Sequence, residues 1–200
     1  MIIGGFQPFT LSDFTGHVAA IVFTQGCNWR CSYCHNRSLL KLKRPVQDLL
    51  PEKYVLDFLL RRCNDLDGLV ITGGEPTIQE DLPRFIRKVR QMGLAVKLDT
   101  NGSRPDVLRA LLEEGLLDYV AMDIKAPLDQ YESITRRPVN VEALQTSIDL
   151  IKNSGVPHEL RTPLILQAEW KSVHQDENDS RTPEDQAFPI APRTKTSKAS

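Results

Sequence analysis

Residues 18–36 read VAAIVFTQGCNWRCSYCHN, a short apolar run followed directly by three cysteines. The run VAAIVFT is typical of a buried β-strand, because it is short and carries no charge. Cys27, Cys31 and Cys34 therefore fall on the loop that leaves the carboxyl end of this strand. Three thiolates on one loop can converge on a metal centre, and thiolates suit zinc or iron–sulfur clusters. The stretch predicts a strand that positions a metal-binding loop.

Short apolar runs and amphipathic helical runs alternate along the rest of the chain. Further strands are expected at residues 69–72, 95–99, 119–124 and 159–166, and helices at 51–64, 81–93, 103–115 and 140–155. This alternation predicts parallel β/α units. A complete eight-stranded barrel usually needs about 250 residues. We therefore expect an α/β fold, either a partial (β/α) barrel of five visible units or an open sheet, with its chemistry at the carboxyl ends of the strands.

Composition excludes several classes of protein. Lys and Arg number 25 against 26 Asp and Glu, so the formal net charge of −1 favours neither nucleic acid nor an anionic membrane as the partner. No apolar run reaches the roughly 18–20 residues of a membrane-spanning helix. Residues 1–10 lack the basic cluster of a signal peptide. We therefore expect a soluble cytoplasmic protein. A secreted disulfide framework would spread its cysteines further apart, and in a cytoplasmic chain such crowding favours metal or redox chemistry.

The last part of the chain differs in composition from the rest. Residues 167–200 are mostly polar and charged, and no helical or strand period persists through them. Such a segment cannot bury enough apolar surface to offset the entropy of ordering. The sequence thus predicts a folded domain over residues 1–166 and a disordered polar tail over residues 167–200.

The spacing C-x3-C-x2-C, with Tyr33 just before the last cysteine, resembles the radical S-adenosylmethionine (SAM) superfamily. In that family, three cysteines hold a [4Fe-4S] cluster and SAM chelates the fourth iron. The resemblance implies that Cys27, Cys31 and Cys34 are the cluster ligands. On spacing alone, adding His35 to give a Cys3His zinc site remains an alternative, and three core cysteines beside a turn are a second. The remaining Cys63 lies in a predicted helix and is expected to pack there.

Four further motifs follow the later strands: GGEP at 73–76, LDTNG at 98–102, MDIK at 122–125 and ELRT at 159–162. Taken alone, they are ordinary glycine turns, a surface ion pair and an arginine in a strand. Their order resembles the SAM-binding segments of the same superfamily. The residues that the resemblance assigns to SAM are Gly73, Gly74, Glu75 and Asp99 for its ammonium, Asp123 and Lys125 for its ribose and carboxylate, Arg161 for its carboxylate or the substrate, and Tyr33 and His35 for its adenine.

Residues 4–36 look like the start of the anaerobic ribonucleoside-triphosphate reductase activating proteins, and pyruvate formate-lyase activating enzymes are similar. The resemblance covers about residues 2–166. It implies reductive cleavage of SAM and abstraction of a Cα hydrogen from a glycine of a partner glycyl radical enzyme. It also implies a flavodoxin or ferredoxin as electron donor and a monovalent cation near Asp123.

Members of this group usually continue with at least one more β/α unit, so the fold is expected to be shortened at its C-terminus. Three alternatives stay open at this point. The chain could be an activase of pyruvate formate-lyase or another glycyl radical enzyme, a zinc-stabilised binding protein, or an inactive truncated homologue.

Overall fold

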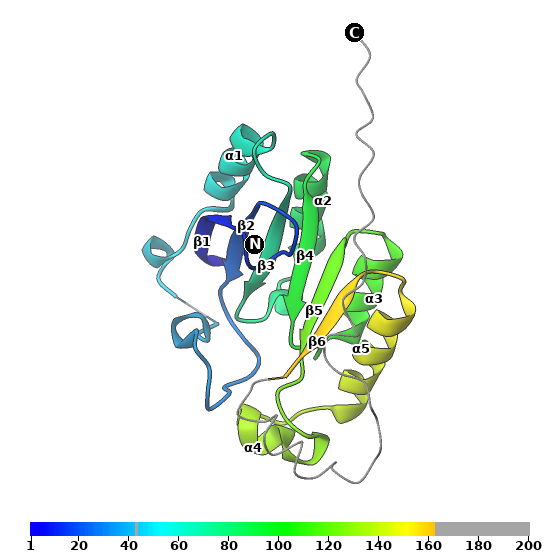
Figure 1. Cartoon of the computed structure of the whole chain (residues 1–200). Coiled ribbons are helices and arrows are strands. Elements are labelled where there is room, and N and C mark those ends of the chain that lie inside the picture. Colours follow the sequence, from blue (N-terminus) through cyan, green and yellow to red (C-terminus); the bar gives the residue numbers. More distant parts are fainter. Residues whose placement is uncertain (43, 163–200) are drawn as a thin grey trace.

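One six-stranded sheet organises the residues that the computed structural model describes, 1–42 and 44–162. The strands lie side by side in sequence order (Figure 1). β1 is antiparallel to β2, and every later neighbour is parallel. The strands are β1 (Ile3–Thr10), β2 (Ala19–Thr24), β3 (Gly68–Gly73), β4 (Ala95–Thr100), β5 (Tyr119–Asp123) and β6 (His158–Arg161). The predicted α/β fold of parallel units is confirmed.

Helices connect the successive parallel strands. The α-helices are α1 (Glu52–Arg62), α2 (Leu82–Gln91), α3 (Pro105–Glu113), α4 (Tyr131–Thr135) and α5 (Val141–Asn153), and the 3-10 turns are η1 (Arg37–Leu39), η2 (Val46–Asp48), η3 (Pro76–Ile78) and η4 (Leu128–Gln130). Asn140 caps α5 as its side chain accepts a hydrogen bond from Ala143 N at 3.0 Å. Among the described residues, no helix combines the length and apolarity needed to cross a membrane.

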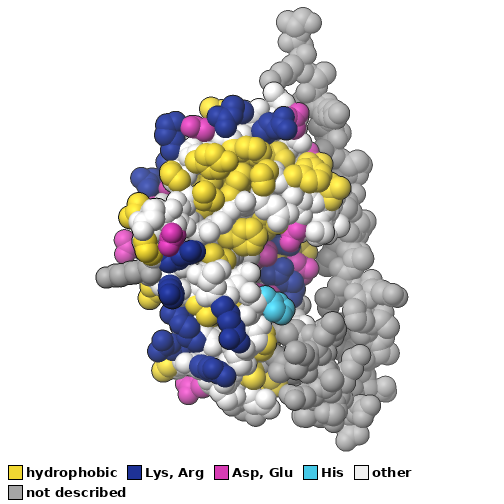
Figure 2. Space-filling model, turned by 90° about the vertical axis from the view of Figure 1, so that its left-hand side faces the viewer, with side chains coloured by type: hydrophobic (Ala, Val, Ile, Leu, Met, Phe, Trp, Pro, Cys, Tyr) yellow, Lys and Arg dark blue, Asp and Glu magenta, His cyan; other side chains and the backbone are white. Residues whose placement is uncertain are grey.

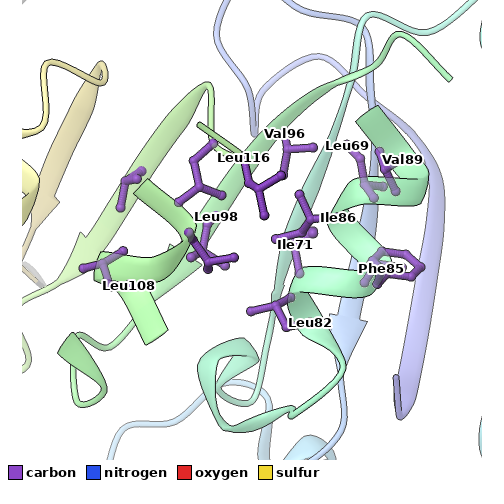
Figure 3. Close-up of a cluster of buried hydrophobic side chains, with 14 of the residues drawn as sticks. Leu69, Ile71, Leu82, Phe85, Ile86, Val89, Val96, Leu98, Leu108 and Leu116 are labelled. Atoms are coloured by element: carbon purple, nitrogen blue, oxygen red, sulfur yellow. The ribbon is translucent and has the colours of Figure 1, made fainter. Parts of the chain in front are cut away.

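The main core lies between one face of the sheet and the helices. In α2, Leu82, Phe85, Ile86 and Val89 recur at helical spacing and are fully buried. Figure 3 shows them in one buried cluster with Ile71, Val96 and Leu98 of the sheet. Each such Leu, Ile or Phe contributes about 1.5–3 kcal/mol of burial free energy. This packing fixes the strands, and with them the loops at their carboxyl ends.

We call the face of the sheet opposite to these helices the inner face. It is apolar at one end of the strands and polar at the other. Phe14, on the connection between β1 and β2, packs against Ala19, Ile21, Val70 and Ala95. These residues close the amino-terminal end of the inner face. Because side chains alternate along a strand, the later inward positions of β4 to β6 fall at the carboxyl ends. They carry Lys97, Asp99, Asp123, Glu159 and Arg161, so charged groups gather there.

All five predicted strands are present, with ends that differ by one or two residues where the structure describes them. The last predicted strand ends earlier, at Arg161, and residues 163–166 and the predicted tail lie outside the described residues. The sequence analysis missed β1, because Gly4, Gly5 and Pro8 interrupt its apolar pattern. An edge strand tolerates them, since its outer hydrogen-bonding groups need no partner strand and its register shifts twice.

Candidate active site

The three clustered cysteines lie on the loop after β2, as predicted. The loop is held by backbone hydrogen bonds from Gly26 N to Leu39 O (2.7 Å) and from Arg30 N to Thr135 O (2.8 Å). All three thiols are free; Cys27 is buried, and Cys31 and Cys34 are partly exposed. Burial raises the pKa of Cys27 to about 11 and also raises the pKa of Cys31. Metal binding at this loop would therefore release protons from the thiols.

The arrangement of the thiols bears on the choice between zinc and an iron–sulfur cluster. Within the described ranges, no three His, Cys, Asp or Glu side chains are grouped closely enough to hold a single metal ion. His35 is exposed on the loop surface. The compact Cys3His set of the zinc alternative is therefore not formed. A cluster takes one thiolate at each of several separate irons, so a wider spacing of soft sulfur ligands suits it.

A cavity of about 610 Å³ lies over the carboxyl ends of the strands. This volume is in the range of small-molecule sites. The cavity brings together every site residue predicted from the sequence, which are Cys27, Cys31, Tyr33, Cys34, His35, Gly73, Gly74, Glu75, Asp99, Asp123, Lys125 and Arg161. Their position in one site follows from the shared direction of β2 to β6, because parallel strands end at the same edge.

A chain of alternating charges crosses the cavity. Arg161 donates to Asp123 Oδ1 through Nε at 2.8 Å, and its Nη2 lies 3.2 Å from Asp99 Oδ2. Lys125 Nζ donates to Asp123 Oδ2 at 2.8 Å. Burial opposes ionisation of Asp123, but the charges of Lys125 and Arg161 outweigh it, so its pKa lies below the ordinary value. Asp123 is thus an anion whose two oxygens both accept hydrogen bonds, and it holds the side chains of Lys125 and Arg161 in place.

Asp99 differs from Asp123 in having one oxygen without a hydrogen bond. Its Oδ1 atom is buried and has no hydrogen-bond partner in the part of the chain that the structure describes. Lys97 Nζ lies 3.7 Å from this oxygen, beyond hydrogen-bond distance. Burial raises the pKa of Asp99, although Arg161 and Lys97 act in the opposite direction. A buried acceptor without a donor is costly, and an ammonium group placed in the cavity would satisfy it.

Glu75 does not present free oxygens to the cavity. It is 1% exposed, and its carboxylate accepts hydrogen bonds from Thr77 N, Thr77 Oγ1, Thr100 Oγ1 and Asn101 N. Burial raises its pKa, while these hydrogen bonds act to lower it. Glu75 therefore joins the loop after β3 to the loop after β4. The predicted contact between Glu75 and the SAM ammonium stays a prediction.

The two glycines before Glu75 are required by the chain's own packing. A Cβ on Gly73 would lie 2.3 Å from Thr24 N, and φ at Gly73 is +121°. A Cβ on Gly74 would lie 1.9 Å from Gly26 O. Glycine lets another group approach the backbone closely because it has no Cβ. In the structure, the backbone that approaches is the end of β2, which carries the cysteine loop.

Two residues that contact the site from outside the cavity lining were not predicted. Lys97 is 6% exposed, and its Nζ donates to Asp13 O (2.7 Å) and Glu159 Oε1 (3.2 Å). Tyr131 of α4 accepts a hydrogen bond from Lys125 N at 2.9 Å. Lys97 has a signal in the sequence, because it stands two residues before Asp99 in a strand and so shares its face. Tyr131 has none, since a five-residue helix is too short to show a period.

Tyr33 has a contact that the sequence analysis did not foresee. Its hydroxyl donates to Lys125 O at 2.8 Å. Burial raises its pKa well above the ordinary value, so the hydroxyl stays protonated and keeps donating. Tyr33 thus ties the cysteine loop to the end of β5. Its predicted packing on the SAM adenine stays a prediction.

Comparison with known proteins agrees with this geometry. Residues 21–175 match the model of the radical SAM superfamily. The chain belongs to the radical SAM superfamily. This membership implies a [4Fe-4S] cluster and SAM as cofactors. The three thiols fit the cluster, and Asp99 Oδ1, which has no hydrogen-bond partner in residues 1–42 and 44–162, fits the SAM ammonium.

The chain is similar to proteins with different names. A Methanocaldococcus jannaschii protein named as a glycyl-radical enzyme activating enzyme is 34% identical over 172 residues, 82% of this chain and 68% of that protein. A 7-carboxy-7-deazaguanine synthase of Methanopyrus kandleri is 37% identical over 133 residues, 57% of this chain and 52% of that protein. Of several other curated relatives, this chain spans about half or less.

Solved structures show the same fold. The structure of native anSMEcpe with bound AdoMet (SAM) superposes with a TM-score of 0.52 at 19% identity, over 68% of this chain and 41% of that chain. At this identity the likeness establishes the radical SAM fold alone.

Proposed function

We propose that this chain is a radical SAM activase that takes a Cα hydrogen from a glycine of a partner enzyme. The observation that carries the proposal is one cavity lined by the three thiols and by Asp99, whose buried Oδ1 has no hydrogen-bond partner among the described residues. The similarity to the M. jannaschii protein named as a glycyl-radical enzyme activating enzyme supports the reaction class. The resemblance of residues 4–36 favours anaerobic ribonucleoside-triphosphate reductase as the partner, with pyruvate formate-lyase as the alternative. Free cysteines favour the cytoplasm.

Each side chain has a physical task in this proposal. The Cys27, Cys31 and Cys34 thiolates hold the cluster, and Asp99 Oδ1 accepts from the SAM ammonium. Asp123 orients the ribose and Lys125 the carboxylate, and orientation is what makes a bound pair reactive. When bound, the cluster and SAM supply one-electron reductive cleavage of a carbon–sulfur bond, which the protein does not perform itself.

Arg161 bridges the carboxylates of Asp99 and Asp123 and so fixes the distance between them. Its contact with SAM is a separate part of the proposal. Its guanidinium and Lys125 already contact both oxygens of Asp123. The contacts of Asp123 therefore give no support to the monovalent cation that the resemblance implies near it. The positive charge at this place comes from the chain's own residues.

The decisive experiment is anaerobic reconstitution of the chain with iron, sulfide, SAM and dithionite, in the presence of anaerobic ribonucleotide reductase. We expect an electron paramagnetic resonance signal of a glycyl radical on the reductase. A parallel reaction with pyruvate formate-lyase tests the alternative partner. Formation of 5′-deoxyadenosine without a radical on either protein would contradict the activase but keep the radical SAM enzyme. A colourless protein with one bound zinc would contradict both.

Asp99→Asn is expected to weaken SAM binding by about 10- to 100-fold. A hydrogen bond to a charged group is worth about 1.5–3 kcal/mol, and the amide keeps the shape but loses the charge. SAM affinity is measured by titration calorimetry of the cluster-loaded protein, together with iron per chain, which should stay constant. Asp57→Asn, on the surface of α1, is the matched control. Unchanged SAM affinity in Asp99→Asn would show that the ammonium binds elsewhere.

A further inference from the structure

Four charged side chains form a closed ring on the inner face of the sheet, and we call them the charge ring. Lys97 and Asp99 come from β4, and Glu159 and Arg161 come from β6. Glu159 Oε1 lies 3.2 Å from Lys97 Nζ and 3.7 Å from Arg161 Nη1. Asp99 Oδ2 lies 3.2 Å from Arg161 Nη2, and Asp99 Oδ1 lies 3.7 Å from Lys97 Nζ. Each carboxylate therefore lies between two cations.

A small residue on the intervening strand lets the two halves of the charge ring meet. β5 separates β4 from β6, and its residue Ala121 is opposite Asp99 on one side and opposite Glu159 on the other. Because side chains alternate along a strand, Ala121 shares the inner face with Asp123. A single methyl group at this position does not block the longer side chains that reach across β5. The residues of three neighbouring strands thus bring the four charges together.

Lys97 lies close to an unsatisfied carboxylate oxygen without binding it. Its Nζ donates to Asp13 O at 2.7 Å and to Glu159 Oε1 at 3.2 Å, but Asp99 Oδ1 is 3.7 Å away. That oxygen is buried and has no hydrogen-bond partner among residues 1–42 and 44–162. A shift of about 1 Å would bring Nζ within hydrogen-bond distance, and a buried acceptor without a donor is costly. The contacts with Asp13 and Glu159 therefore hold Lys97 back.

The charge ring lies partly in the cavity wall and partly outside it. Asp99 and Arg161 line the cavity, whereas Lys97 and Glu159 do not belong to the lining that the structure describes. The side chain of Lys97 is 7% exposed, and that of Glu159 is 40% exposed. Figure 2 shows that acidic and basic side chains also gather at the surface, near the middle of one face. Lys97 thus approaches Asp99 from outside the cavity lining, and its position decides whether Asp99 Oδ1 is open to a ligand.

We propose that Glu159 is a positioning residue, which holds the Lys97 ammonium away from Asp99 and so keeps Asp99 Oδ1 free for the ammonium group of a ligand in the cavity. The proposal rests on the proposed function, which assigns that oxygen to the SAM ammonium. Burial raises the pKa of Asp99, and the charges of Arg161 and Lys97 oppose that rise. Lys97 thus supports the ionised form of Asp99 from a distance at which it does not occupy the oxygen.

Loss of the Glu159 charge would let Lys97 move to Asp99. A neutral amide accepts a hydrogen bond from an ammonium group less strongly than a carboxylate does. In Glu159→Gln, the ionised Asp99 is therefore the better acceptor for Lys97. SAM would then have to displace an ammonium group that the chain itself supplies. The cost appears as lost SAM affinity, and it depends on the presence of Lys97.

The test is a double-mutant cycle on the cluster-loaded chain, with Glu159→Gln, Lys97→Met and the two substitutions combined. Titration calorimetry measures the SAM affinity of each variant, and iron per chain is measured in parallel. Glu114→Gln is the matched control. Glu114 also pairs with an arginine, since Arg87 Nη2 lies 2.7 Å from its Oε2, and its side chain is 45% exposed.

We expect Glu159→Gln to bind SAM at least about tenfold more weakly, because hydrogen bonds between charged groups are among the strong ones. When Lys97→Met is already present, adding Glu159→Gln should change the affinity by less than about twofold, since no ammonium remains to occupy Asp99. Iron per chain should not change, and Glu114→Gln should bind SAM like wild type. Unchanged affinity in Glu159→Gln would overturn the proposal. So would an equal loss with and without Lys97, which would mean that Glu159 acts on SAM directly or through Arg161.

A second measurement does not depend on the folding of Lys97→Met. In a crystal structure of cluster-loaded Glu159→Gln without SAM, Lys97 Nζ should lie within about 3.2 Å of Asp99 Oδ1. A Lys97 side chain that stays in its original place would contradict the proposal. Radical formation on the partner enzyme is scored separately. Wild-type protein that binds and cleaves SAM but forms no glycyl radical would contradict the proposed function alone, whereas wild-type protein that binds no SAM would contradict both.

Discussion

Cys31→Ala is expected to abolish 5′-deoxyadenosine formation from SAM while leaving the chain folded. Cys31 is partly exposed on a loop, so its removal creates little cavity in the core. The loss of one of three thiolates removes a ligand of the cluster itself. We expect SAM cleavage to fall by more than about a hundredfold, beyond the 10- to 100-fold typical of losing an outer-shell partner of a metal site. Product formation, iron per chain and absorbance near 400 nm measure the effect.

Cys63→Ala is the matched control for this prediction. Cys63 ends α1 and makes a local contact, as its Sγ lies 3.2 Å from Leu60 O. This variant should keep its iron, its brown colour and its rate of SAM cleavage. If Cys31→Ala still produced 5′-deoxyadenosine, or if Cys63→Ala lost iron equally, the assignment of the three loop cysteines to the cluster would be wrong.

Gly74→Ala is expected to lower the free energy of unfolding by about 3 kcal/mol or more, at the upper end of overpacking substitutions. The new methyl would lie 1.9 Å from Gly26 O and 2.5 Å from Gly26 C, both backbone atoms that cannot rotate away. Glu75 N also donates to Gly26 O at 2.8 Å, so the two loops are already joined there. The methyl must therefore push the cysteine loop aside. Urea unfolding of the chain measures the stability, and iron content reports the displaced loop.

Gly5→Ala separates this effect from a general cost of replacing glycine. A Cβ on Gly5 would meet Phe23 at 3.5 Å, which is ordinary van der Waals contact. Its unfolding free energy should stay within about 1 kcal/mol of wild type. Equal stability of Gly74→Ala and Gly5→Ala would show that the contact between the loops after β2 and β3 is adaptable.

The sequence predicts the sheet well where a strand is buried on both faces. Runs such as LVIT at 69–72 are apolar because helices cover one face of the sheet and the residues packed around Phe14 cover the other. The strand-end rule then predicts correctly that the motifs meet in one cavity. β1 is not predicted, because Gly4, Gly5 and Pro8 are tolerated only in an edge strand. Which strand lies at the edge is decided by the assembled sheet and not by the local sequence.

The contacts inside the site were less predictable than its location. The carboxylate of Glu75 is surrounded by donors from its own and the following loop, and that arrangement exists only after folding. Lys97 depends on the carbonyl of Asp13, which lies far from it in sequence. Such long-range partners leave no local pattern, so the sequence identifies the polar residues but not which of them bind one another.

The backbone of Lys125 is held from both sides by tyrosine hydroxyls. Tyr131 accepts from its N–H, and Tyr33, which stands between Cys31 and Cys34, donates to its carbonyl. Ordering of the cysteine loop therefore also orders the end of β5, and ordering of the end of β5 also orders the cysteine loop. Under the proposed function, we therefore expect cluster assembly and SAM binding to reinforce one another, because the second event loses less conformational entropy than the first. Removal of either phenol hydroxyl is therefore expected to weaken the coupling between these two binding equilibria.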